Sequence, residues 1–400
     1  MPDFSVISEA EMFRLQVIAS VNSLGATEAP ANPKSLCWCR SGESWDNCHK
    51  VREALRQLTA GEIQFLSRKA QVRATCQHPL ASHQTCSPDG PIGSHTVQEG
   101  GSLRAIADRG HVYSSKKGFE EMHKNNGVVG MRAIGVSIAS VFPGYCSPHD
   151  AELFKYVECE KSPLDTTAAL LLSMRAVAYE VFAKETQLNG INAKSKFMDQ
   201  GLPFHLQSLV QNVLHSDRIG VEQGMADIRA LAGRYQAAYD APGSSGFHAF
   251  GIRFDRILPF AAAGAFFAEV DFQGRVLRRV DSRDAISQIA LNIATLGQST
   301  CVTFGWFGES DCAAAKLVDS FNALDDYQKA EASLVLALEH LENFFCSPSW
   351  WDELPEGNRS RFDQSIAGGM TRGARDPNAL VMRGDVDFGA KVVETLDSRI

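Results

Sequence analysis

The spacing of apolar residues predicts helices near the start of the chain. Residues 8–22 open with Ser8 three positions before Glu11, the pattern of a capped helix, and apolar residues then recur every three or four positions. Residues 51–72 show the same spacing. Residues 76–150 are rich in Gly, Ser, His and Pro and contain only short strand-like apolar runs. We therefore expect that segment to be a small unit whose apolar core alone does not hold it together.

The hydrophobic pattern changes in the second part of the chain. Ala, Leu and Met at helical spacing predict helices over residues 163–240. Residues 246–280 then alternate apolar and polar positions around a turn at residues 272–274, so we expect a β-rich unit there that extends through residues 287–297 and 299–308. Helical spacing returns over residues 313–345, and the tail beyond Gly368 is polar and rich in Gly.

Length and composition describe a folded chain of several domains. Four hundred residues exceed what one hydrophobic core usually supports, which favours two to four domains. The apolar fraction of 44% and the charged fraction of 22% are ordinary for a folded protein. Lys and Arg number 39 against 47 acidic residues, and the net charge of −8 argues against a protein that covers itself with nucleic acid through bulk charge.

The chain lacks the sequence features of a signal peptide or a membrane span. Its N-terminus carries acidic residues early, and the most apolar stretch, residues 166–182, is interrupted by Arg175, so we interpret that stretch as a buried helix. We therefore expect a cytoplasmic protein with no membrane partner. In a reducing compartment, clustered cysteines indicate metal binding before disulfides. Six of the ten cysteines and seven of the eleven histidines lie in the first 150 residues.

The first Cys/His cluster falls within fourteen residues. Its spacing is Cys-x-Cys, eight intervening residues, then Cys-His, from the residues Cys37, Cys39, Cys48 and His49. A structural zinc ion takes four such ligands in tetrahedral geometry. The segment Arg40–Gly42 can form the turn between the two pairs, because Ser and Gly tolerate the backbone angles of a turn. We therefore predict a zinc site here.

This spacing resembles the SEC-C motif, a short zinc-binding module found in many bacterial proteins. The residues Ser41, Gly42 and Trp45 also fit its pattern, whereas Arg40 stands where the motif has Gly. The resemblance implies a zinc knuckle over roughly residues 33–53. It also implies that the knuckle either braces the fold or docks a protein partner, and the sequence leaves both readings open.

The second Cys/His cluster is spread over residues 76–149. Cys146 and His149 have the C-x-x-H spacing of a zinc half-site, and two earlier cysteines could complete it. The predicted ligands are Cys76, Cys86, Cys146 and His149, with His78 or His83 as possible replacements for one member. The expected cofactors are thus two structural zinc ions.

Two further histidines, His95 and His111, flank a predicted short helix. The order of a strand ending in His, a turn, a helix and a second His resembles the ββα-metal core of HNH nucleases. That resemblance implies His95 as the general base and His111 as a ligand of one divalent catalytic cation. The middle Asn of that family is absent, so a noncatalytic treble-clef-like zinc unit, or ordinary core histidines, are the alternatives. Residues 100–135 carry six basic and three acidic side chains, and Lys116 and Lys117 could face phosphates or simply solvent.

These patterns together predict a multidomain α+β protein with zinc-stapled N-terminal modules, a helical middle, a β-rich unit and a helical C-terminus. The expected parts are residues 1–60, a helix plus the SEC-C-like knuckle; 61–160, the second zinc-stapled ββα or treble-clef-like unit; 161–245, helical; 246–312, β-rich; and 313–400, helical with a polar tail.

The functional hypothesis is a zinc-binding, nucleic-acid-associated bacterial protein with HNH-like nuclease activity. The alternative is a noncatalytic scaffold whose zinc units dock protein partners. Discriminating between them requires the positions of His95 and His111 relative to any cation ligands.

Overall fold

The computed structural model describes residues 24–25, 28–69, 74–115, 130–241, 243, 246–278, 286–368 and 375–399. The helix expected over residues 8–22 and the loop with Lys116 and Lys117 lie outside these residues. Contacts within the chain define two units. Unit 1 comprises the described parts of residues 1–73 and 183–227, and unit 2 comprises the described parts of 74–182 and 228–400.

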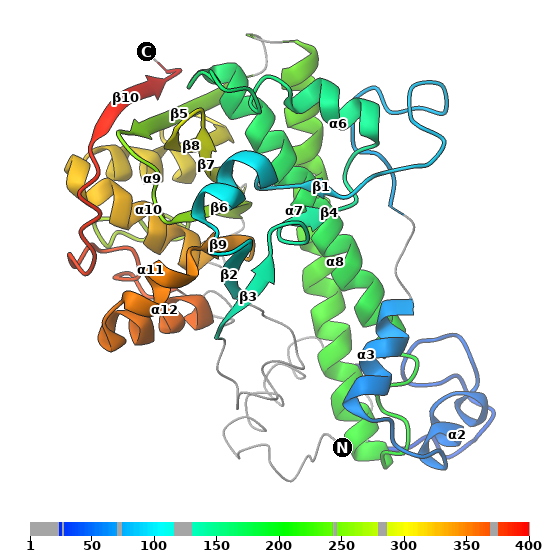
Figure 1. Cartoon of the computed structure of the whole chain (residues 1–400). Coiled ribbons are helices and arrows are strands. Elements are labelled where there is room, and N and C mark those ends of the chain that lie inside the picture. Colours follow the sequence, from blue (N-terminus) through cyan, green and yellow to red (C-terminus); the bar gives the residue numbers. More distant parts are fainter. Residues whose placement is uncertain are drawn as a thin grey trace. The chain divides into compact units, whose positions relative to one another are not determined.

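Within its described residues, unit 1 has one small apolar cluster. Its described elements are η2 (Trp45–Asn47), α2 (His49–Glu53), α3 (Ala60–Lys69) and portions of the long helices α7 (Thr166–Lys194) and α8 (Phe204–Asp240), all but η2 labelled in Figure 1. The buried apolar cluster between the two long helices consists of Ile191, Leu202, Val210, Leu214 and Val221. Such a small cluster supplies only part of what a stable unit needs, so other cross-links are expected to matter here.

Unit 2 is built on an eight-stranded antiparallel sheet. The strand order is β10 (Val392–Asp397), β5 (Phe247–Phe254), β8 (Ser299–Phe307), β7 (Gln288–Leu296), β6 (Phe260–Phe267), β9 (Phe344–Cys346), β2 (His111–Ser115) and β3 (Met131–Gly135). A separate two-stranded sheet pairs β1 (Ser94–His95) with β4 (Val141–Phe142). The strands β5 to β8 therefore fall inside the predicted β-rich unit.

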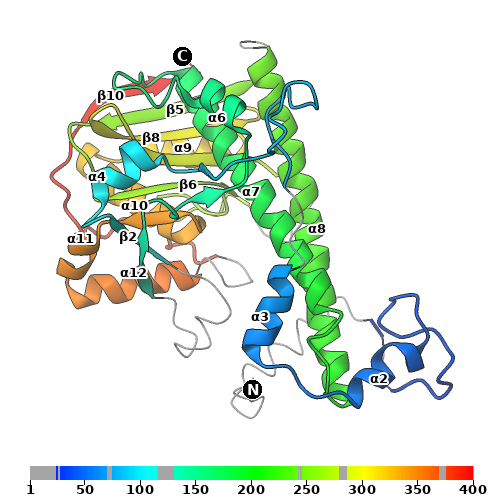
Figure 2. The ribbon, with the colours of Figure 1, turned by 45° about the vertical axis from the view of Figure 1, so that its right-hand side comes forward.

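One face of the large sheet carries the main apolar core. Helices α9 (Ala313–Asn322) and α10 (Asp326–His340) lie against this face (Figures 1 and 2). Side chains of the strands and of these helices form one buried cluster, in which Phe250, Phe304 and Leu334 are fully buried. Unit 2 also contains residues 166–182 of α7 and residues 228–240 of α8. The other helical elements described in unit 2 are η3 (Glu99–Leu103), α4 (Arg104–Ile106), α6 (Ser147–Phe154), α11 (Pro348–Glu353) and α12 (Glu356–Gly368).

The opposite face is lined by small residues where the first half of α7 packs on it. A Cβ atom added to Gly305 would lie 2.3 Å from the hydroxyl of Ser173 on α7, so only glycine permits this approach. Within α7, Arg175 is 2% exposed, and its charge is met by an ion pair to Glu158 of 2.6 Å and by the ring of Phe154 at 3.6 Å. The interpretation of this stretch as a buried helix is consistent with these contacts.

Helix α7 is the one helix of the described residues with the length and composition to cross a membrane. Of its most apolar window, 67% is buried inside the protein, which is typical of the core helix of a soluble protein.

The predicted fold class, a mixture of helices and strands in more than one unit, is confirmed. The C-terminal region is mainly helical but also supplies β9 and β10. With three residues, β9 is too short for its alternation to be recognised in the sequence. The division of the chain into five parts stays a prediction.

Candidate metal centres

The first cluster is organised by a tight loop and a short helix. The loop reverses at Arg40 and Gly42, whose φ angles of 62° and 83° lie in the left-handed region. Its start is closed by a hydrogen bond of 3.1 Å from the Arg40 N–H to the Cys37 carbonyl. The 3₁₀ turn η2 then leads into α2, which begins at His49 directly after Cys48. The predicted turn residues thus bring the two ligand pairs face to face.

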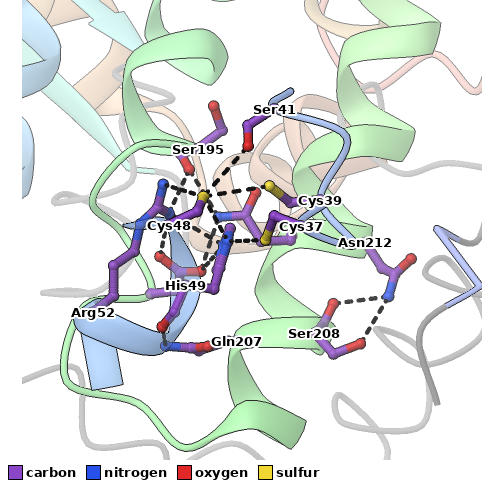
Figure 3. Close-up of polar contacts among 12 residues, drawn as sticks. Cys37, Cys39, Ser41, Cys48, His49, Arg52, Ser195, Gln207, Ser208 and Asn212 are labelled. Carbon is purple, nitrogen blue, oxygen red and sulfur yellow. Dashed lines mark hydrogen bonds and ion pairs between the residues drawn. The ribbon is translucent and has the colours of Figure 1, made fainter. Parts of the chain in front are cut away.

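The four side chains of this cluster converge, and we call it site 1. Figure 3 shows the sulfurs of Cys37, Cys39 and Cys48 turned toward the ring of His49. The Nδ1 atom of His49 lies 3.3 Å from the Cys37 sulfur and 3.2 Å from the Cys48 sulfur, and the sulfurs of Cys39 and Cys48 are 3.7 Å apart. Tetrahedral zinc requires about 3.6 Å between nitrogen and sulfur ligands and about 3.8 Å between sulfurs, from its usual bond lengths. Site 1 therefore has the donors and nearly the spacing to hold a zinc ion.

A buried carboxylate accepts a hydrogen bond from the ring nitrogen of His49 that faces away from the sulfurs of site 1. The Nε2 atom of His49 donates to the carboxylate of Asp199 over 2.7 Å, and both side chains are 0% exposed. With Nε2 protonated, Nδ1 presents its lone pair to the sulfurs. This carboxylate–histidine arrangement is the usual outer shell of a zinc ligand. Asp199 also accepts hydrogen bonds from Arg52 at 2.9 Å and from Gln211 at 3.0 Å.

The electrostatics of site 1 favour negative charge on two of the three sulfurs, those of Cys39 and Cys48, whereas the hydrogen bond with Cys39 raises the pKa of the Cys37 thiol above its usual range. Hydrogen bonds from the thiols of Cys37 and Cys48 hold the pKa of the Cys39 thiol far below its usual range. The guanidinium of Arg52 lies 3.7 Å from the Cys48 sulfur. A zinc ion with three thiolates carries one net negative charge, which Arg52 would partly offset. Thiolate is the form that binds zinc, so the electrostatics agree with the geometry.

The second cluster, site 2, lies in unit 2 and is assembled around the start of α6. Cys146 is the N-cap of that helix and His149 lies in its first turn. The backbone N–H of Cys146 donates to the sulfur of Cys76 over 3.3 Å. Cys86 ends a turn closed by a hydrogen bond of 3.0 Å from its N–H to the Ser82 carbonyl.

Site 2 has the same Cys3His composition as site 1. The Nδ1 atom of His149 lies 3.4 Å from the sulfur of Cys76, 3.7 Å from that of Cys86 and 3.2 Å from that of Cys146. Three edges of one tetrahedron therefore meet at this nitrogen. Burial opposes a thiolate at Cys146, but hydrogen bonds from the N–H groups of Ser87 and His149 lower the pKa of this thiol. Site 2 could also hold a zinc ion.

The outer shells of the two sites differ. Among the residues that the structure describes, His149 has no hydrogen-bonded carboxylate. Its ring stacks instead on that of His78, with centroids 4.0 Å apart and planes 7° from parallel. His78 and Glu152 lie close enough to form a cation site with His149. The nitrogen lone pairs of two stacked imidazoles, however, point along parallel planes and do not converge on one ion. The Nδ1 atom of His78 also already accepts the Leu80 N–H at 3.0 Å.

The alternative ligands named from the sequence do not join site 2. His78 belongs to the stacked pair just described, and His83 is exposed. The geometry thus favours His149 as the fourth ligand.

The histidines of the HNH resemblance lie apart from both sites. The Nε2 atom of His95 is 3.5 Å from the Glu99 carboxylate, and His111 is exposed with its Nδ1 atom 3.1 Å from the Arg109 carbonyl. Among the described residues, neither belongs to a group of three or more potential cation ligands. Their assignment to catalysis stays a prediction.

The residues that sequence reasoning missed are those of the outer shell of site 1. Asp199 and Gln211 lie about 150 residues beyond the knuckle along the chain. Neither has a local spacing that signals metal binding, because the fold alone brings them to His49.

Comparisons with models of protein families, with curated proteins and with solved structures found no match for this chain.

Proposed function

We propose that this is a noncatalytic zinc protein in which two closed Cys3His sites each hold a structural zinc ion. The observation that carries the proposal is the convergence of three sulfurs and one imidazole nitrogen at each site. Catalytic zinc sites keep one coordination position open for water or substrate, whereas structural sites fill all four positions with protein ligands. Both clusters supply four ligands, so the structural role is favoured.

Site 1 has the stronger support. Its histidine donates to a fully buried carboxylate, and the apolar cluster in the described part of the unit has five buried residues. Binding of zinc to a small segment can contribute on the order of 10 kcal/mol to its folding. The resemblance to the SEC-C motif agrees with such a knuckle and remains part of this proposal.

Metal analysis of the purified protein tests the proposal. We expect two zinc ions per chain by mass spectrometry, and one in a Cys146→Ser variant. Protein folded and purified with zinc present that binds none would refute it.

Two predictions made from the sequence go beyond zinc binding. Nucleic-acid binding with nuclease activity, and docking of a protein partner by the knuckle, are supported by resemblance alone. A nuclease assay with added Mg²⁺ or Mn²⁺ should compare the wild type with His95→Ala. Cleavage that depends on His95 would contradict the noncatalytic proposal, and absence of cleavage in both would agree with it.

A further inference from the structure

We propose that metal binding at site 1 orders the connection between α7 and α8, and that Asp199 is the positioning residue that couples the two. The connection comprises residues 195–203, which link the two long helices within unit 1. This inference rests on the proposed zinc binding at site 1.

The connection is hydrogen-bonded directly to the zinc knuckle. The side chain of Arg52 donates to the Ser195 carbonyl over 2.9 Å, and the N–H of Gly201 donates to the Arg52 carbonyl over 2.8 Å. Gly201 has a φ of 77°, and a Cβ there would lie 2.7 Å from the Gln57 backbone nitrogen. Both ends of the connection are therefore held by residues that closely follow the ligands Cys48 and His49.

Asp199 lies at the centre of these contacts. One carboxylate oxygen faces His49 Nε2 at 2.7 Å and Gln211 at 3.0 Å, and the other faces Arg52 at 2.9 Å. A second glutamine, Gln207 on α8, donates to the His49 carbonyl over 3.1 Å. Figure 3 shows Arg52, Ser195 and Gln207 around the ring of His49. His49 thus connects the sulfurs to the buried carboxylate through its two ring nitrogens, and Arg52 makes a second connection between the Cys48 sulfur and the same carboxylate.

A bound ion would fix the His49 ring through Nδ1, and the fixed ring would hold Asp199 through Nε2. Without a bound ion, the ring could rotate about its side-chain bonds, and Asp199 would lose one partner while remaining buried. A buried carboxylate that loses a partner is strongly unfavourable, so the connection should loosen. The five apolar residues of the local cluster offer limited compensation.

Coupling of this kind is reciprocal. If metal binding orders the connection, then weakening the Asp199 contact must weaken metal binding by the same free energy. Loss of an outer-shell partner typically costs 10- to 100-fold in metal affinity, about the size we expect for Asp199→Asn. The amide oxygen can still accept from His49, but the variant loses the charge that faces Arg52.

The experiment compares full-length wild type, Asp199→Asn and Asp227→Asn, each with zinc and after chelation. Asp227 is a half-buried α8 residue of the same unit and makes no hydrogen bond or ion pair within the described part of the chain, so it is the matched control. Zinc affinity is measured by chelator competition, ligand geometry by the absorption spectrum of the Co²⁺-loaded protein, and local order by hydrogen exchange of peptides covering residues 195–203.

We expect chelation of the wild type to speed exchange over residues 195–203. Asp199→Asn should bind zinc 10- to 100-fold more weakly, shift the Co²⁺ spectrum and exchange faster at 195–203 even when zinc is bound, while Asp227→Asn behaves as wild type. If Asp199→Asn does not fold, the comparison of hydrogen exchange over residues 195–203 in wild type with and without zinc tests the inference by itself. Zinc binding without any change in exchange at 195–203 would overturn this inference and leave the proposed function intact. No zinc at site 1 would overturn both.

Discussion

Substitution of Cys37 by Ser should remove one zinc ion and destabilise unit 1. The thiol of Cys37 is 4% exposed and lies 3.3 Å from the Nδ1 atom of His49, so no other described side chain replaces it as a ligand at site 1. Structural zinc contributes about 10–16 kcal/mol in small zinc peptides, and one ligand of four accounts for about 3 kcal/mol if the ligands share it equally. That free energy is about a 150-fold loss of affinity.

The assay for this prediction is competition with a chromogenic zinc chelator, followed by thermal unfolding in saturating zinc. At a fixed excess of zinc, a 150-fold weaker site lowers the ligand-linked stability by about 3 kcal/mol. Cys159→Ser is the matched control, because Cys159 is exposed and belongs to neither cluster. A Cys37→Ser protein with two tightly bound zinc ions and the control's stability would refute the assignment of site 1.

Three further predictions concern unit 2. His149→Phe should lose the zinc of site 2, whereas His78→Phe should retain it, because only His149 directs a nitrogen at the sulfurs; zinc analysis of both variants checks this. Gly305→Ala should cost about 1–3 kcal/mol through overpacking against Ser173, while Gly135→Ala meets open space and should be near neutral by urea unfolding. Burial raises the pKa of Glu331, so the folded state keeps this proton to higher pH than the unfolded chain. The resulting stability is fully present below the unfolded pKa of about 4.3 and is lost as pH rises through the folded pKa. The advantage of wild type over Glu331→Gln in unfolding free energy should therefore shrink as pH rises above about 4.3; a difference that does not vary with pH would contradict this.

The Cys and His residues that converge at the two sites could be recognised in the sequence because structural zinc sites draw their ligands from short-range spacings. Cys37 and Cys39 are one residue apart, and Cys48 adjoins His49, so the chain itself limits where these side chains can point. For site 2, the spacing of Cys146 and His149 marked a half-site, and only folding determined that His149 rather than His78 completes the cluster.

Features that depend on distant parts of the chain were not predictable from one sequence. Asp199 contacts His49 because it lies in the connection between α7 and α8, which the fold brings to the knuckle. The sequence around Asp199 has no pattern that indicates this contact. The alternation over residues 246–280 indicated the strands β5 and β6, since side chains on opposite faces of a sheet repeat every two residues, and β7 and β8 lie in the later part of the predicted β-rich unit. The order of those strands, and the insertion of the three-residue β9 between β6 and β2, left no comparable pattern.

The close approach of α7 to the sheet at Gly305 changes how the apolar character of that helix should be interpreted. A glycine in the strand lets a helix settle so deep that protein surrounds it on most sides, and such a helix must be apolar around most of its circumference. Its sequence then resembles one made for lipid, although its neighbours are other parts of the same chain. The high hydropathy of α7 therefore reflects how much of the helix is buried by the rest of the chain. Gly305 on the facing strand allows that burial because it has no side chain.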